Sequence, residues 1–301
     1  MRTKNFQKQL VPYLYLLPGM IFLSVWLVYP MIQAMNISLH DWEIMPGRTS
    51  PFVGLAHYLQ AGTDPLFWSA LRNTAFYALV TVFGQLTLGV SIALMVDRLI
   101  RGQVIFRVLY YLPVVTSWVV VSLLFKYLFN SSPAGFINYL FVDVFHILSS
   151  PVPWLNEANT AWVAIYSLGI WKGVGWTMVI ILAALQLLPE ECFSAASIDG
   201  ANDFQSLIFI KLPLLLPTII LVFIMLTIGA VQAYIQVALI TGGGPLHRTD
   251  VILSYMYYLA FNDLDYGYSS SLSFILAAIV FVISQAQLRL QRPIEMTAGG
   301  N

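Results

Sequence analysis

Uninterrupted apolar stretches constrain the fold of this sequence more than any other feature. A transmembrane helix needs about 20 consecutive apolar residues to cross the hydrocarbon core of a bilayer. Stretches of about this length contain no Asp, Glu, Lys or Arg at residues 9–39, 73–96, 108–125, 212–246 and 266–288, and a further stretch at 162–188 contains Lys172 alone. We therefore predict an all-α integral membrane protein, with six transmembrane helices at about residues 11–36, 73–96, 107–129, 162–188, 216–240 and 267–288.

The amino-acid composition agrees with a chain that lies in a lipid bilayer. Of the 301 residues, 59% are hydrophobic and 9% are charged, whereas soluble proteins carry roughly 25% charged residues. The formal net charge is zero, so nothing indicates nucleic acid as a partner. Three basic residues precede the first apolar stretch, but that stretch far exceeds the ~7–15 residues of a signal-peptide core. We expect an uncleaved first span and a single transmembrane domain over residues 1–301.

The basic residues predict the orientation of the six spans. Cytoplasmic loops of membrane proteins carry more Lys and Arg than outer loops do. With the N-terminus inside, nine of the 14 Lys and Arg residues lie in inner segments, namely Arg2, Lys4, Lys8, Arg98, Arg101, Arg107, Lys211, Arg289 and Arg292. Both termini are therefore predicted to lie inside the cell, as is the segment between the fourth and fifth spans. Residues 251–261 are apolar but too short to span, and we expect them to form a helix at the outer surface.

The sequence contains no evident energy source for transport and no catalytic group. Carriers coupled to protons or sodium usually keep a carboxylate within the membrane, but none of the 14 Asp and Glu residues falls inside a predicted span. There is no G-x-x-x-x-G-K-[ST] loop for ATP, no catalytic Ser/His/Asp arrangement, and no metal-ligand spacing among Cys192 and the four His residues. Three classes remain open: a carrier or facilitator that acts alone, a membrane-embedded enzyme or assembly factor, and a transport subunit driven by another polypeptide.

The polar segment at residues 189–212 is the best candidate for contact with such a polypeptide. Glu190 and Glu191 suit the first turn of a helix, because the helix dipole favours acidic side chains there. Asp199 and Gly200 form a turn signal, after which a second short helix can begin. A connection between spans needs only a few residues, so a folded loop of this length indicates a surface for a partner. The alternative is an interfacial hairpin that lies on the lipid.

The fourth predicted span carries a pair of residues that suits a substrate path. Lys172 and Trp176 are four residues apart, share one helix face, and have room beside them at Gly173. A charged side chain at membrane depth is costly, so Lys172 is expected to face a wet cavity or the bundle interior. An indole face near an ammonium donor suits a sugar, whose ring presents C–H groups and hydroxyls. The alternatives are that Lys172 snorkels outward and that Trp176 faces lipid or the core.

The fifth predicted span offers a second set of polar residues. Gln232 and Gln236 are four residues apart in an apolar stretch, with Tyr234 between them. Such residues can line a substrate path. They can equally join neighbouring helices through hydrogen bonds, and both interpretations stay open.

An ordered set of motifs runs from about residue 10 to 290. Residues 194–201 read Ser-Ala-Ala-Ser-Ile-Asp-Gly-Ala, and residues 210–213 read Ile-Lys-Leu-Pro. This pair resembles the EAA loop of binding-protein-dependent ABC importer permeases, E-A-A-x-x-D-G-A followed by I-x-L-P. Three more stretches resemble the carbohydrate branch of that family, which includes maltose and glycerol-phosphate permeases: Phe-Val-Gly-Leu-Ala-His-Tyr at 52–58, Tyr-Leu-Pro at 111–113, and Leu-Ile-Thr-Gly-Gly-Gly-Pro at 239–245.

The resemblance implies a multi-subunit importer in a bacterial or archaeal inner membrane. The chain would be a permease subunit, not an enzyme, that translocates a sugar or oligosaccharide by alternating access. Its partners would be an ATP-binding cassette ATPase subunit, a second homologous permease and an extracytoplasmic solute-binding protein. The chain would hold no cofactor, because ATP and magnesium would bind to the ATPase. The leading alternative is a secondary carrier or facilitator for a small polar solute.

The resemblance also implies roles for particular residues. The segment around Trp176 would be part of a transmembrane sugar site. The loop would form a coupling helix that docks on the ATPase, with Glu190, Glu191, Ser194, Ala195, Ala196, Asp199, Gly200 and Ala201 as its functional residues. Ser194 departs from the family pattern, since it stands where the motif has its glutamate. Glu190 or Glu191 would substitute from one helical turn earlier.

Overall fold

The computed structural model of the chain describes residues 2–45, 47, 49–99 and 102–298. Residues 2–11 and 290–298 are described by their backbone alone. Part of the charge pattern used above therefore lies outside the described residues: Arg101 altogether, and the side chains of Arg2, Lys4, Lys8 and Arg292. The orientation with both termini inside stays a prediction.

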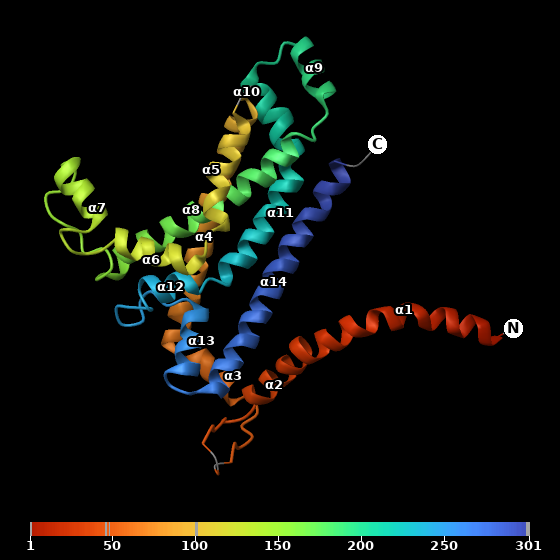
Figure 1. Ribbon diagram of the computed structural model, residues 1–301, viewed down its shortest axis with the longest axis vertical. Helices are drawn as coiled ribbons and strands as arrows, with labels where there is room; N and C mark the ends of the chain where they lie inside the picture. The colour runs from red at the N-terminus through yellow and green to blue at the C-terminus, as the bar shows by residue number, and fades with distance from the viewer. Residues whose placement is uncertain (1, 46, 48, 100–101, 299–301) are drawn as a thin grey trace. The chain divides into compact units, whose positions relative to one another are not determined.

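The described residues are mostly helical, with longer non-helical connections at about 39–55, 145–157 and 241–251. The only β pairing among them is a single bridge between His40 and Phe52. Short π-helical segments lie at Ser24–Val28, Leu140–Val144 and Leu207–Lys211. In chain order the α-helices of Figure 1 are α1 (Arg2–Leu23), α2 (Tyr29–Ser38), α3 (Ala56–Thr63), α4 (Pro65–Asp97), α5 (Gln103–Val115), α6 (Trp118–Leu128), α7 (Phe136–Tyr139), α8 (Ala158–Leu185), α9 (Glu190–Ile198), α10 (Asp203–Ser206), α11 (Leu212–Val231), α12 (Ile235–Ile240), α13 (Ile252–Phe261) and α14 (Tyr266–Ala298).

Helix length and apolarity confirm an all-helical membrane architecture. Within the described part of the chain, 5 helical segments are long and apolar enough to cross a membrane, or 6 if one bent pair counts as a single span. The 5 segments are Pro12–Ser38, Pro65–Asp97, Ala158–Leu185, Asp203–Val231 and Tyr266–Arg289, and the bent pair is Gln103–Val115 with Trp118–Leu128.

The chain divides into two compact units, of which the first comprises Met1–Asp64 and Met256–Ala277. The Tyr268 hydroxyl donates a hydrogen bond of 2.7 Å to the Asp64 carboxylate. His57 is buried beside them, with its Nε2 atom 3.3 Å from the carbonyl oxygen of His40. These polar contacts join the α2–α3 region to the start of α14. The long apolar segment Pro12–Ser38, by contrast, buries 0% of its most apolar window within the chain.

The second unit, Pro65–Tyr255 with Ala278–Asn301, contains both regions that concern function. Its helices α4, α8 and α11 contact one another (Figure 1), and α8 is the most buried of the candidate spans. Small residues allow the close approach of α4 to α8. A Cβ atom at Gly84 would lie 2.6 Å from Ile170, and one at Gly89 would lie 2.5 Å from Thr177. Such packing is typical of membrane helices, which gain little from burying apolar area against one another in lipid.

The third predicted span differs from the single helix expected at 107–129. Helix α5 ends at Val115, residues Thr116 and Ser117 are extended, and α6 leaves at an angle of 93°. Pro113 favours the break, because it has no N–H for the carbonyl one turn earlier and its ring crowds that turn. The sequence showed the proline, but not that the chain would turn so sharply after it.

The fifth predicted span is also divided. Helix α11 ends at Val231, Tyr234 is not helical (φ −144°, ψ −60°), and α12 begins at Ile235. The expectation of one continuous helix at about residues 216–240 was therefore wrong, and Gln232 and Gln236 do not lie on the same helix. Gln236 instead hydrogen-bonds to α4, an interaction that spacing along the sequence cannot reveal.

Candidate functional site

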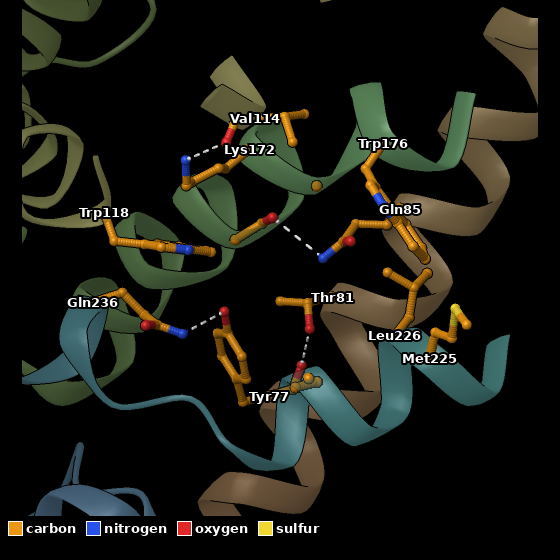
Figure 2. Close-up of a pocket in the computed structure, with 14 residues that line it drawn as sticks. Tyr77, Thr81, Gln85, Val114, Trp118, Lys172, Trp176, Met225, Leu226 and Gln236 are labelled. Atoms are coloured by element: carbon orange, nitrogen blue, oxygen red, sulfur yellow. Dashed lines mark hydrogen bonds between the residues drawn. The ribbon is translucent and has the colours of Figure 1, made fainter. Parts of the chain in front are cut away.

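A cavity of about 370 Å³ lies in the second unit, beside the middle of α8 (Figure 2). Its size falls near the lower end of the range for small-molecule pockets, which are clefts of roughly 300–1,000 Å³. It is lined from α4, from the break between α5 and α6, and from α8, α11 and α12. The lining residues are Tyr77, Thr81, Gln85, Val114, Trp118, Gly169, Lys172, Gly173, Trp176, Met225, Leu226, Gly229, Ala230 and Gln236.

The cavity brings together some of the residues named from the sequence and not others. Lys172, Gly173 and Trp176 of α8 all line it, as does Gln236 of α12. Gln232 and Tyr234 are not among the lining residues, because the chain leaves the helical path between α11 and α12. Lys172 and Trp176, which share one face of α8, both line the cavity. Of the two glutamines, only Gln236 does so.

The ammonium group of Lys172 is occupied by backbone carbonyls. Its Nζ atom donates to the carbonyl oxygens of Pro113 at 2.8 Å, Val114 at 3.3 Å and Thr116 at 2.6 Å. It also lies 4.9 Å from the centre of the Trp118 ring, within the range of a cation–π interaction. The side chain is only 4% exposed. Lys172 therefore neither snorkels outward nor points a free ammonium into the cavity.

The break between α5 and α6 explains why a lysine is placed there. The last carbonyls of a helix lack intrahelical partners, and an unsatisfied backbone group costs several kcal/mol within a membrane. Lys172 supplies three N–H donors to the carbonyls of Pro113, Val114 and Thr116 at this break. The Pro113 carbonyl also accepts from the Thr116 hydroxyl, at 2.6 Å. Its charge also complements the negative end of the α5 dipole. A buried ammonium and a broken helix would each cost free energy alone. The hydrogen bonds between them reduce both costs.

Helix α4 contributes polar residues that the sequence reasoning missed. Tyr77, Thr81 and Gln85 are spaced four residues apart and form a polar stripe on one face. Gln85 Nε2 donates to the Gly169 carbonyl at 3.2 Å, and Gln236 Nε2 donates to the Tyr77 hydroxyl at 2.9 Å (Figure 2). The stripe was visible in the sequence as regularly spaced polar residues in a charge-free span, and the same test that singled out the fifth span would have found it.

Glycines on α8 keep the cavity wall open to these polar groups. A Cβ atom at Gly169 would lie 2.6 Å from the Tyr77 hydroxyl oxygen, and one at Gly173 would overlap the Gln85 carboxamide. A larger residue at either position would push the amide or the phenol out of place. The wall thus combines amide and hydroxyl groups with the indole rings of Trp118 and Trp176, a combination that can bind hydroxyls and pack against C–H faces.

The segment predicted as a partner surface forms two helices and a turn. Pro189 is the residue before α9, which begins at Glu190 with two acidic residues in its first turn. Gly200 has φ +79°, a conformation that glycine adopts without the cost other residues meet. Helix α10 begins with a reciprocal capping pair, in which the side chains of Asn202 and Gln205 bond to each other's backbone N–H. The predicted helix–turn–helix is therefore present.

Most side chains of this segment are exposed. Helix α9, all of which is described, contains no buried residue. Ile198 is 86% exposed and Phe204 is 67% exposed. Of the predicted coupling residues, Ala196 and Ala201 are partly covered, while Glu190, Glu191, Ser194, Ala195, Asp199 and Gly200 are exposed.

Ionic contacts tie the base of the segment to the end of α4. Lys211 Nζ lies 3.4 Å from the Asp97 carboxylate, and both side chains are about three-quarters covered, with 26% and 23% exposed. The same ammonium lies 5.3 Å from the centre of the Phe193 ring on α9. Arg98 and Asp203 form a second, more exposed contact at 3.8 Å. Lys211 is therefore shared between α4 and the segment that contains α9, and neither contact was predicted from the sequence.

Comparison with protein families finds one match that covers most of the chain. Residues 85–295 match the family described as binding-protein-dependent transport system inner membrane component. The matched range includes most of the cavity lining and the whole α9–α10 segment.

Curated relatives extend the similarity to nearly the full chain. The multiple sugar-binding transport system permease protein MsmF of Streptococcus mutans is 32% identical over 94% of this chain and 95% of its own length. The lactose transport system permease protein LacF of Rhizobium radiobacter is 30% identical over 93% of both chains. Among solved structures, a bacterial ABC transporter involved in the import of the acidic polysaccharide alginate matches with a TM-score of 0.84 and 22% identity, covering 98% of this chain and 99% of the other. That likeness shows a shared fold.

Proposed function

Because the chain belongs to the family of binding-protein-dependent transport system inner membrane components, we propose that its cavity beside α8 is part of the path by which a sugar or oligosaccharide crosses the membrane. The chain is a permease subunit of an ABC importer and a multi-pass inner-membrane protein, and it is not an enzyme. The single observation that carries the proposal is the meeting of two indole rings with amide and hydroxyl groups in one cavity.

The lining supports a sugar by its chemistry. Trp118 and Trp176 offer flat apolar faces to the C–H groups of a pyranose ring, while Gln85, Gln236 and Tyr77 offer hydrogen-bonding groups to its hydroxyls. Relatives whose names specify multiple sugars and lactose favour the same substrate class. We also propose that Gln232 and Tyr234 contribute to the path, from positions outside the lining of this cavity.

The α9–α10 segment supports the second part of the proposal, which is coupling to an ATPase. Its exposed apolar side chains, Ile198 and Phe204, have no cover within the described chain, so a partner surface would bury them. We assign the coupling role to Glu190, Glu191, Ser194, Ala195, Ala196, Asp199, Gly200 and Ala201. An ATP-binding cassette subunit would dock here and hold ATP and magnesium, while a second permease and an extracytoplasmic solute-binding protein would complete the importer.

These parts give a mechanism of alternating access in which this chain performs no chemistry. Closure of the ATPase dimer on ATP would move α9 and α10. The contacts of Lys211 with Asp97 and Phe193 would transmit that movement to the end of α4, and α4 continues along the cavity through Gln85, Thr81 and Tyr77. Hydrolysis would return the helices to their starting positions. Both termini and the α9–α10 segment would lie on the cytoplasmic side.

Transport by the reconstituted complex tests the proposal. The chain is co-purified with its ATPase, second permease and binding protein, placed in liposomes, and assayed for ATP-driven uptake of lactose and other labelled sugars. We expect uptake of at least one sugar, and a raised KM for it in Trp176→Ala. Trp171→Ala is the matched control, because Trp171 lies five residues earlier in α8 and packs against Phe125 outside the cavity lining. Unchanged KM in Trp176→Ala, or uptake by the purified chain alone without ATP, would remove the proposed function.

A further inference from the structure

The geometry points to Lys172 as a positioning residue: it holds the broken end of α5 and sets Trp118 against the cavity, and it does not anchor a charged group of the substrate. This inference rests on the proposed function, in that it concerns how the same cavity takes its ligand. A lysine in a transport cavity would otherwise be assigned to an anionic substrate by default.

The first step is a count of hydrogen-bond donors. An ammonium group has three N–H donors and no acceptor. Three carbonyl oxygens, those of Pro113, Val114 and Thr116, accept from Lys172 Nζ at 2.8, 3.3 and 2.6 Å. All three donors are therefore engaged by the protein. A carboxylate or sulfonate on a ligand could bind the ammonium only by displacing a carbonyl that lies at a helix break.

The second step is the close packing of α5 on α8, which brings those carbonyls to the lysine. Gly175 follows Lys172 by three residues on α8, and a Cβ atom there would overlap the carbonyl of Tyr110 on α5. The backbone of α5 can approach α8 because that Cβ is absent. One turn further along α5, the carbonyls at the helix break then lie within reach of Nζ. Figure 2 shows the hydrogen bond to the Val114 carbonyl.

The third step connects the break to the cavity. Helix α6 begins at Trp118, immediately after the two extended residues. The ring of Trp118 lies 4.9 Å from Nζ and lines the cavity (Figure 2). The direction of α6 and the position of this indole thus depend on the same three carbonyls that Lys172 holds.

The fourth step concerns charge. Among the described lining residues, Lys172 is the only one with a charged side chain, and none is acidic. With its ammonium engaged by carbonyls and by an indole face, the wall contributed by this chain offers neutral donors and acceptors. This chain's part of the cavity is therefore fitted to an uncharged, hydroxylated ligand.

The test compares Lys172→Met, Trp118→Leu and the double variant in the complete reconstituted importer. Lys126→Met is the matched control, because Lys126 lies on α6 but its side chain is exposed outside the cavity lining. Hydroxyl-radical labelling of Trp118, read by peptide mass spectrometry, reports the position of the indole without any substrate. Uptake of lactose and of sulfoquinovosyl glycerol provides a neutral and an anionic probe, and Trp176→Ala monitors the cavity itself.

We expect Lys172→Met to change the labelling of Trp118 and to raise the KM for lactose by about five- to tenfold, the scale of one lost side-chain contact. The double variant should be no worse than either single variant, because the lysine acts through the tryptophan. Lys126→Met should change neither quantity.

Several results would overturn the inference. One is unchanged labelling of Trp118 in Lys172→Met. Another is a double variant whose fold-change in KM equals the product of the two single fold-changes. A selective loss of sulfoquinovosyl glycerol transport in Lys172→Met would show an anion anchor instead. If Lys172→Met does not assemble, an unchanged lactose KM in Trp118→Leu overturns the inference and a raised KM supports it. A raised KM in Trp176→Ala, with an unchanged KM in the Lys172 and Trp118 variants, would reject the inference and keep the proposed function. An unchanged KM in all of these variants would reject both the inference and the proposed function.

Discussion

The cavity beside α8 and the α9–α10 segment differ in which side chains they bury and which they expose. In the cavity, polar groups are buried and paired: Lys172 is 4% exposed, and its donors meet three carbonyls. In the segment, apolar groups are exposed and uncovered: Ile198 is 86% exposed. A buried polar group without a partner is costly in a membrane, and so is an exposed apolar group in water. The cavity thus pairs its polar groups within the chain, whereas the segment leaves apolar side chains exposed, which the proposed ATPase partner would cover.

The difference extends to how each region tolerates change. The cavity depends on close contacts that leave no room for a Cβ atom, whereas the segment depends on one backbone conformation and on a few ionic contacts at its base. Substitutions in the cavity should alter the KM for sugar uptake. Substitutions in the segment should alter the number of ATP molecules hydrolysed per sugar transported. The predictions below are arranged by the size of the effect expected.

The largest effect is expected from Gly200→Pro. Gly200 has φ +79°, whereas proline fixes φ near −65°, so the turn between α9 and α10 cannot form. We expect ATP-driven uptake to fall by about a hundredfold or more, since a misplacement of about 1 Å can already cost a hundredfold in function. Sugar binding to the importer should persist. Gly200→Asn is the control, because asparagine tolerates positive φ. Normal ATP-driven uptake by Gly200→Pro would contradict the coupling role.

The fold could be predicted from the sequence much further than the site. Charge-free stretches predicted the helices, and the Asp199–Gly200 turn predicted the break between α9 and α10. The sequence contained Pro113, but it did not predict the sharp turn after Val115 or the break after Val231. Both breaks also involve contacts with other helices, such as Lys172 to α5 and Gln236 to Tyr77. Single-helix spacing cannot show such contacts.

The residues of the cavity illustrate the same limit. Lys172 and Trp176 were found because they share a helix face, but the partner of Lys172 was not, because backbone carbonyls leave no signal in the sequence. Gln85 was visible as part of a polar stripe on α4, yet only the structure brings that stripe to the glycines of α8.

A tenfold effect on the KM for sugar is expected from Gly173→Ala. The added Cβ would overlap the carboxamide of Gln85, which must then leave its bond to Gly169. Overpacking of this kind costs about 1–3 kcal/mol of stability, and a loss of about 1.4 kcal/mol in sugar binding is a tenfold rise in KM. Gly229→Ala is a matched control in the same cavity, since a Cβ there meets nothing within 4 Å. Equal KM values in the two variants, measured by uptake, would argue against the cavity as the path.

A smaller effect is expected from Asp97→Asn. It removes the charge that pairs with Lys211 at 3.4 Å, and the pair is partly covered. We expect two- to fivefold more ATP hydrolysed per sugar transported, on the scale of about 0.5–1 kcal/mol for such a pair. Arg98→Ala should leave this ratio nearly unchanged, because its contact with Asp203 is exposed at 59% and 92%. A larger effect from Arg98→Ala than from Asp97→Asn would show that the movement is transmitted through the contact between Arg98 and Asp203 instead.

The smallest effect is expected from Ser194→Glu. This change introduces the acidic residue that the motif of the family has at this position, on an exposed part of α9. If Glu190 or Glu191 already provides the charge one turn earlier, ATP-driven uptake should change by no more than about twofold, since exposed ion pairs contribute about 0–1 kcal/mol. A gain of tenfold or more would show that the missing glutamate limits coupling in this importer.

The division of labour between the cavity and the α9–α10 segment is tested most directly by measuring ATP hydrolysed and sugar taken up in the same liposomes. Trp176→Ala should raise the sugar concentration for half-maximal uptake and leave the ATP used per sugar unchanged. Gly200→Pro should leave sugar binding unchanged and raise the ATP used per sugar, or stop uptake altogether. If both variants alter the same quantity, the two regions do not have the separate roles that their burial and contacts indicate.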